Sequence, residues 1–228
     1  MPKIKTKKGE YKYRTKSLYP GMKKIDRKIA KENLLLFQKI LDANHLNFGL
    51  LYGTLLGAVR EHDFIEHDED IDLFILDEDH EKFLDLLFEL DANGFRVIRY
   101  DQRGLISIMR KNEYIDIYFF SVLSSGVRCC SGLCVKEPFL LETTMFDFLG
   151  SRFLIPRDYI DYLNFEYGND WMIPIAYTDF NVSGFHAFYY QLKDWLKSFL
   201  PDFIYFKIKK RREEMMIADF NNKNLEKN

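Results

Sequence analysis

The most constraining feature of this sequence is an aspartate inside an apolar run, Ile71-Asp72-Leu73-Phe74-Ile75, with a second aspartate, Asp70, directly before it. In a β-strand, alternate side chains point to the same face. Asp70 and Asp72 would therefore share one face, while Ile71 and Leu73 enter the core. Two neighbouring carboxylates repel each other, and a strand keeps such a pair when a cation compensates their charge. The pattern predicts a sheet with a cation-binding edge.

A second strand-like run, Tyr114-Ile115-Asp116-Ile117-Tyr118, places a single aspartate among apolar neighbours. If this strand pairs beside the first, Asp70, Asp72 and Asp116 converge on one metal site. Hard oxygen ligands suit Mg²⁺, with Mn²⁺ as an alternative, and Mg²⁺ commonly takes substrate phosphates as further ligands. Such a cluster can align a phosphate and neutralise charge as an attacking oxygen arrives.

A phosphate-binding turn is predicted just before these strands. The apolar run Phe48 to Tyr52 indicates a strand, Gly53 a turn, and the segment from Thr54 to Arg60 a short helix. A helix start of this kind presents backbone N–H groups and a hydroxyl to an anion. Gly53, Thr54 and Arg60 are therefore candidate phosphate ligands, the arginine through its guanidinium.

The remaining pattern predicts one α/β domain, a mixed sheet flanked by helices, with a helical C-terminal third. We expect a basic flexible arm over 1–24, a catalytic core over 25–156 and a helical region with a basic tail over 157–228. The predicted helices are Ile25 to Leu46, Glu78 to Ala92, Tyr159 to Tyr167 and Ala187 to Leu200, and further strands are Phe95 to Tyr100, Leu105 to Arg110 and Tyr114 to Phe120.

Charge is distributed unevenly along the chain. Residues 1–31 hold twelve Lys and Arg against two acids, and residues 207–228 hold seven against four, which leaves an excess of fifteen acids between them. A nucleic-acid-binding core would carry its positive charge on the folded face, so no nucleic-acid partner is expected. The basic ends instead predict peripheral contact with an anionic membrane.

The expected location is the cytoplasm, with peripheral contact at the inner face of the membrane as an option. The longest apolar runs fall well short of a membrane-spanning length, and the lysine-rich start has no apolar segment of the kind found in signal peptides. Cys129, Cys130 and Cys134 are an odd number without a nearby histidine, so they are expected to be reduced, partly buried thiols.

The chain resembles the LicD/fukutin-related family of the nucleotidyltransferase superfamily. Tyr52 to Arg60 matches the family's Tyr-Gly-Thr-Leu-Leu-Gly-Ala-Val-Arg signature, and Asp68-Glu69-Asp70-Ile71-Asp72 matches its acidic motif with one conservative change. Ile115 to Ile117 resembles a later Ile-Asp-Ile strand, and Tyr167 to Pro174 a Tyr-Gly-x-Asp-Trp-x-x-Pro element. The spacer Asp63-Phe64-Ile65-Glu66-His67 departs from the usual Gly-Phe-Ile-Pro-Trp.

This resemblance implies a nucleotidyltransferase-like fold and a Mg-dependent transferase. It would move phosphocholine or a polyol phosphate from a CDP-linked donor to a sugar of a glycan or lipid-linked acceptor. Asp70, Asp72 and Asp116 would hold the metal. The general base stays open between a metal-binding aspartate, Asp68 and His67, and Asp68 is counted among the candidate catalytic residues.

Two alternatives use the same residues differently. A nucleotidyltransferase would move the nucleoside monophosphate itself onto a small molecule, a protein or RNA, with the other phosphorus attacked. An inactive scaffold in glycan assembly would need no chemistry at all, although a degenerate site usually lacks at least one of the metal-binding acids, and none is missing here.

Overall fold

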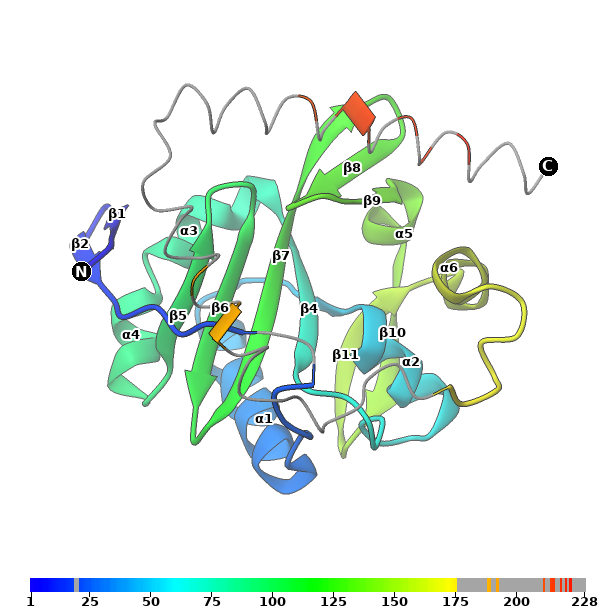
Figure 1. Ribbon diagram of the computed structural model, residues 1–228, viewed down its shortest axis with the longest axis horizontal. Helices are drawn as coiled ribbons and strands as arrows, with labels where there is room; N and C mark the ends of the chain where they lie inside the picture. Colours follow the sequence, from blue (N-terminus) through cyan, green and yellow to red (C-terminus); the bar gives the residue numbers. More distant parts are fainter. Residues whose placement is uncertain are drawn as a thin grey trace.

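The computed structural model describes residues 1–18 and 21–175, and the single residues 188, 189, 192, 211, 214, 215, 218, 220 and 222. Its centre is a nine-stranded mixed sheet (Figure 1). The strand order is β10 (Thr143–Phe148), β11 (Ser151–Pro156), β3 (Gly49–Leu50), β4 (Ile71–Leu76), β7 (Glu113–Ser124), β6 (Leu105–Arg110) and β5 (Arg96–Asp101). Two further strands, β8 (Val127–Cys130) and β9 (Leu133–Lys136), extend from the end of β7.

Helices flank this sheet, so the predicted α/β class with a mixed sheet is confirmed. The longest, α1 (Arg27–Ala43), lies behind the sheet in Figure 1 and buries one apolar stripe that includes Leu34, Phe37 and Leu41. The ring of Phe37 meets Phe48 and Phe95 edge-on. The others are α2 (Tyr52–Arg60), α3 (His80–Leu84), α4 (Leu87–Ala92), α5 (Pro138–Leu141) and α6 (Tyr159–Tyr167).

The helix predicted over Glu78 to Ala92 is divided in the structure. A 3₁₀ turn covers Asp77–Asp79, and α3 and α4 are separated at Asp85 and Leu86. There the backbone N–H of Leu86 donates to Phe83 O, three residues back, which is the tighter 3₁₀ spacing. The apolar face remains continuous across the break, so the apolar periodicity alone could not show that the helix is divided.

The N-terminal segment, predicted as a flexible arm, is folded onto the domain over its first part. Strands β1 (Lys3–Thr6) and β2 (Gly9–Lys12) form a hairpin at one end of the molecule (Figure 1). Ile4, Tyr11 and Tyr13 are buried in the main core. The lysines between them face solvent, which is why the segment resembles a solvated arm by composition.

From the hairpin, residues 13–26 run along the sheet to the acidic loop; we call this segment the N-terminal strap. Its residues 19 and 20 lie outside the described part. Lys16 N donates to Ile98 O on β5 at 3.0 Å, and Gly21 N donates to the Glu69 carboxylate at 2.5 Å. Lys23 pairs with the buried Glu113 at the start of β7. The strap thereby fixes the loop that leads into β4.

The cysteine prediction was wrong for two of the three residues. Cys129 and Cys134 stand directly opposite each other on β8 and β9 and are joined by a disulfide. Cys130 points the other way, because successive strand residues alternate, and its thiol is buried and donates to Gly104 O at 3.1 Å. The short spacing therefore reflects a hairpin.

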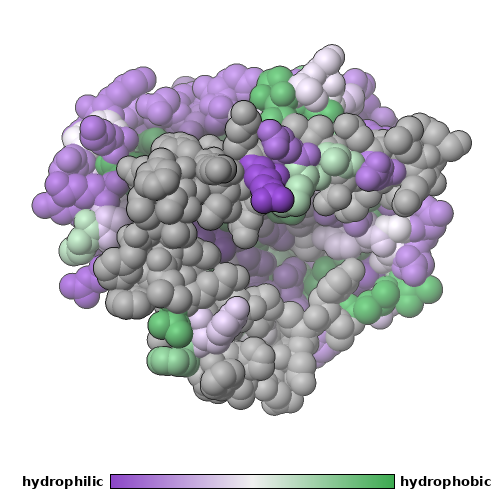
Figure 2. All heavy atoms as spheres, turned by 45° about the horizontal axis from the view of Figure 1, so that its top comes forward, coloured by the Kyte–Doolittle hydropathy of each residue, from purple (hydrophilic) through white to green (hydrophobic). Residues whose placement is uncertain are grey.

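Several exposed apolar side chains lie on separate elements, while Met172, Ile173 and Ile175 lie together in the segment after α6. Phe88, Val122, Leu141 and Met145 lie on α4, β7, α5 and β10. Figure 2 shows hydrophilic side chains over much of the coloured surface and apolar ones in small separate groups. Within the described residues, no helix is long and apolar enough to span a bilayer. Only single residues of the predicted helix from Ala187 to Leu200 and of the basic tail are described, so both remain predictions.

The buried hairpin predicts a stability role for the N-terminus. Ile4→Ala should lower the free energy of unfolding by about 2 to 5 kcal/mol, since it removes a fully packed side chain. Lys5→Ala, on the exposed face of the same strand, is the matched control and should change little. Urea unfolding of both variants checks this, and equal midpoints would show that the hairpin does not contribute to the core.

Candidate metal centre and adjoining cavity

Asp72 is held in place by hydrogen bonds to both its backbone and its carboxylate. Its backbone N–H donates to Thr54 Oγ1 at 2.8 Å, which secures β4 against the start of α2. Its carboxylate accepts from Gly53 N at 3.1 Å and from the Tyr118 hydroxyl at 3.2 Å. In this structure the start of α2 therefore presents the Gly53 N–H to a carboxylate of the protein itself, and phosphate binding there stays a prediction.

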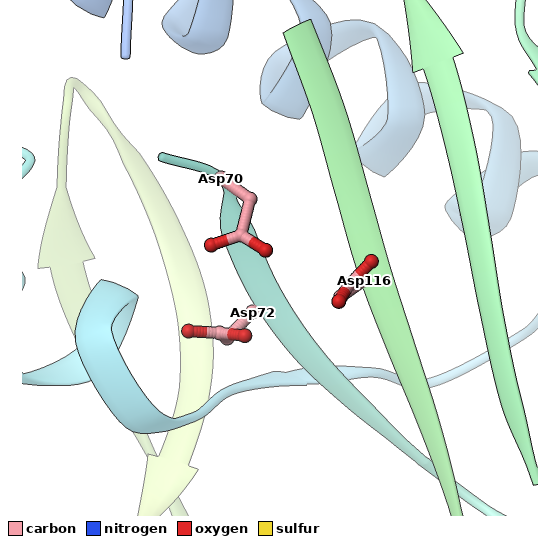
Figure 3. A group of neighbouring side chains, drawn as sticks. All are labelled: Asp70, Asp72 and Asp116. Atoms are coloured by element: carbon pink, nitrogen blue, oxygen red, sulfur yellow. The ribbon is translucent and has the colours of Figure 1, made fainter. Parts of the chain in front are cut away.

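The three predicted carboxylates converge. β4 and β7 are parallel neighbours, and their register places Asp72 directly opposite Asp116. Asp70 precedes β4 by one residue, and one carboxylate oxygen from each aspartate lies within 4.8 Å of the others (Figure 3). Asp72 and Asp116 are buried, while Asp70 keeps partial contact with solvent.

The electrostatics of this cluster call for a cation. Burial, and then mutual repulsion, raise the pKa of the Asp70 and Asp72 carboxyls well above the usual value. Burial also raises the pKa of Asp116, although Arg99 opposes that shift. Within the described part of the chain, Asp116 Oδ1 is buried without a hydrogen-bond partner. A buried oxygen of this kind is costly unless something binds it. These three residues fit a divalent ion.

A fourth acid, Asp68, lies beside Gly53. Burial raises the pKa of Asp68 to about 6, and its Oδ2 is buried without a partner among the described residues. A Cβ atom at Gly53 would lie 2.5 Å from that oxygen, closer than real contacts allow. A side chain at position 53 would therefore have to displace the Asp68 carboxylate.

A cavity of about 460 Å³ opens next to Asp68 and Asp72. One wall of the cavity is formed by α2, which carries the Tyr52 to Arg60 motif. The opposite wall is formed by the segment after α6, which belongs to the Tyr167 to Pro174 motif. Aromatic rings and acids predominate among the lining residues Tyr52, Tyr118, Tyr167, Trp171, His67, Glu166 and Asp170. Tyr52 also has a left-handed backbone, with φ 42°, an unusual conformation for a non-glycine residue.

Arg60 lines this cavity but is already engaged by the protein. Its guanidinium donates to Trp171 O at 2.9 Å and pairs with Glu61 at 2.8 Å. Arg60 thus ties α2 to the Tyr-Gly-Asn-Asp-Trp segment, and Trp171 Nε1 in turn donates to Asn164 Oδ1 on α6. Phosphate binding by Arg60 and Thr54 remains a prediction, because the structure gives both residues internal partners.

Sequence reasoning missed Arg99. This β5 residue pairs with Asp116 and donates from Nε to Ser107 Oγ at 2.8 Å. Its position in a run of alternating residues did not indicate a role at the site, because its contact with Asp116 depends on the pairing of β5, β6 and β7.

An Asp-x-Asp pair at the start of one central strand, opposed by an aspartate on the next strand of a mixed sheet, defines a nucleotidyltransferase-type domain. The sequence matches the LicD/FKTN/FKRP nucleotidyltransferase domain over residues 45–181, more than half of the chain. The chain belongs to this family, as its motifs predict. It is 29% identical over 168 residues to the mouse ribitol-5-phosphate transferase FKTN, and 28% identical over 167 residues to the human protein.

Those matches cover 70% and 69% of this chain, and the chain spans 36% of the length of each relative. Among solved structures, the lincosamide adenylyltransferase LnuA shares 10% identity and a TM-score of 0.43, over 69% of this chain and 91% of that one. The antibiotic-resistance factor ANT(2'')-Ia in solution shares 15% identity and a TM-score of 0.46, over 87% and 95% of the two chains.

The charge cluster predicts pH-dependent stabilisation by divalent ions. Carboxyls with raised pKa bind protons more tightly in the folded than in the unfolded chain, so stability without metal falls as pH rises from about 4 through the raised values. Mg²⁺ or Mn²⁺ relieves that repulsion, and should stabilise by about 2.7 kcal/mol at a hundredfold excess over Kd. The shift in melting temperature between EDTA and metal should therefore be larger at pH 8 than at pH 5.

Asp70→Asn is the control, because it removes one charge without touching the hydrogen bonds of Asp72. It should raise stability in EDTA at pH 8 and lose most of the response to metal. A metal response in Asp70→Asn equal to that of the wild type would contradict the three-carboxylate site.

The contact between Gly53 and Asp68 predicts an effect on activity. Gly53→Ala must displace the Asp68 carboxylate, and a displacement near 1 Å in a reacting site costs on the order of a hundredfold in rate. In an Asp68→Ala background the same change should have little further effect, so the two substitutions should be strongly non-additive. Initial rates of the four proteins test this; additive effects would place the defect elsewhere.

Proposed function

We propose that this chain transfers a phospho-substituent, phosphocholine or a polyol phosphate, from a CDP-activated donor to a sugar hydroxyl of a cell-surface glycan. The observation that carries the proposal is the opposed carboxylate cluster beside an open cavity in a member of the LicD/FKTN/FKRP family. The relatives named ribitol-5-phosphate transferase support a polyol phosphate as one candidate for the transferred group.

In this proposal Asp70, Asp72 and Asp116 hold Mg²⁺, with Mn²⁺ as a substitute. When bound, the ion supplies charge neutralisation at the donor's phosphates. The cavity next to Asp72 receives the transferred group and the acceptor, and its aromatic side chains offer them apolar surface. Family membership and the intact acids argue against an inactive scaffold.

Asp68 is the candidate general base. With a pKa raised to about 6, it is deprotonated at neutral pH yet more basic than an ordinary aspartate, which favours proton acceptance from a sugar hydroxyl. Its Oδ2, which has no hydrogen-bond partner among the residues that the structure describes, and its place in the cavity wall support this role. His67 also lines the cavity and is the alternative.

Transfer of a nucleoside monophosphate is the competing reaction, and the products separate the two. The purified protein is incubated with Mg²⁺ and CDP-choline, CDP-ribitol, CDP-glycerol or CTP, with a glycan acceptor. Release of CMP together with a phosphorylated acceptor supports the proposal. Release of pyrophosphate from CTP with a nucleotidylated acceptor would overturn it in favour of the competing reaction.

The same assay tests the metal-binding residues. Asp70→Asn, Asp72→Asn and Asp116→Asn should each lower the rate on the order of a thousandfold, because a lost ligand removes several kcal/mol of transition-state stabilisation. Lys5→Ala serves as a control with unchanged activity, and circular dichroism verifies that each variant is folded. An Asp116→Asn enzyme with near-normal turnover would contradict metal binding by all three carboxylates.

A further inference from the structure

Arg99 is the only guanidinium that the described structure pairs with the carboxylate cluster. It belongs to a row of directly opposite residues that crosses four strands: Arg99 on β5, Ser107 on β6, Asp116 on β7 and Asp72 on β4. Residues opposite each other in a sheet lie on the same face, so the row is a continuous polar line across the sheet.

A β-bulge creates this alignment. Val97 is paired with Ile108 and Arg99 with Ser107, so Ile98 is an extra residue without its own partner on β6. In a regular ladder Ile98 would stand opposite Ser107 and Arg99 would point away. Bulges commonly re-aim a side chain next to a functional site. Lys16 N of the N-terminal strap donates to Ile98 O at 3.0 Å, which gives the bulged backbone a partner.

The guanidinium is fixed at two points. Nε donates to Ser107 Oγ at 2.8 Å, and Nη2 pairs with Asp116 Oδ2. Asp116 Oδ1, the other oxygen of the same carboxylate, is the buried atom without a partner in the described residues. One oxygen of Asp116 therefore faces a permanent cation and the other remains for a metal ion.

The charges and the free oxygens limit what the site can hold. Asp70, Asp72 and Asp116 contribute three negative charges when ionised and Arg99 one positive charge, so a single divalent ion neutralises these four side chains, and Asp68 beside them adds one further negative charge. With Asp68 counted, a second divalent ion without bound phosphates would still leave excess positive charge in a largely buried site, and Arg99 already engages Oδ2 of Asp116.

We propose that Arg99 takes the place of a second cation, so that the centre binds one divalent ion in the absence of donor. This rests on the proposed function in one respect, the metal-binding role of the three aspartates. Arg99 is a positioning and charge-balancing residue in this scheme, since it acts through Asp116.

The test measures the binding of Mn²⁺ alone, without donor or acceptor. Binding is measured by isothermal titration calorimetry and by the electron paramagnetic resonance signal of free Mn²⁺. The wild type should bind one ion. Arg99→Gln should either bind two ions or bind one at least about tenfold more tightly, because a positive charge beside the metal is gone. Arg99→Lys keeps the charge and should retain one ion.

Two further variants complete the design. Arg96→Gln, on the same strand but paired with Asp91 outside the cluster, is the matched control and should behave like the wild type. Ser107→Ala leaves the charge in place but releases Nε, and should shift Mn²⁺ affinity in the same direction as Arg99→Gln by a smaller factor. If Arg99→Gln does not fold, Ser107→Ala still tests the role of Arg99.

The outcomes are distinct. Two ions bound by the wild type, or unchanged or weaker binding by a folded Arg99→Gln, would overturn the proposal. No Mn²⁺ binding by the wild type would overturn the three-carboxylate site itself. If the ion counts follow the expectation while no CDP-linked donor is consumed, the transferase proposal fails and the role of Arg99 stands.

Discussion

The pairing register between β4 and β7 is the constraint on which the rest of the site depends. It sets Asp72 opposite Asp116, and a slip of one residue would turn Asp116 to the opposite face and replace it with Ile115 or Ile117. The flanking residues oppose such a slip, because Ile71, Leu73, Ile115 and Ile117 are completely buried on the other face. Hydrophobic packing on one side of the sheet thus enforces electrostatic repulsion between carboxylates on the other, a cost that a bound cation would relieve.

Much of this arrangement follows from local patterns. Strands and helices with a clean period, such as β6 and α6, have the predicted bounds. The alternation around Asp70, Asp72 and Asp116 predicted their convergence on the condition that the two strands pair, and the structure shows that pairing. The hairpin β1–β2 was not predictable from composition, because Ile4 and Tyr11 are a small apolar minority among lysines. The role of Arg99 was not predicted for a different reason. The direction of its side chain depends on a β-bulge and on the order of the strands, and both are set by strand pairing.

The two halves of the family signature also have a physical connection. Arg60, at the end of the first motif, binds the backbone carbonyl of Trp171 in the second, although more than a hundred residues separate them. The cavity lies between these segments. Residues that appear to be independent motifs in the sequence are therefore the two walls of one compartment, and a change in either alters the same space.

The N-terminal strap makes the centre depend on the start of the chain. Gly21 binds the acidic loop through Glu69, forty-eight residues further on, and Lys23 binds the start of β7 through Glu113. Closing loops of this length costs entropy, as does the pairing of Asp72 with Asp116, so these contacts stabilise the centre only together. The approach to Asp70 is therefore set by the first part of the polypeptide as well as by the central strands, and a substitution in the strap can alter the metal centre without touching any of its ligands.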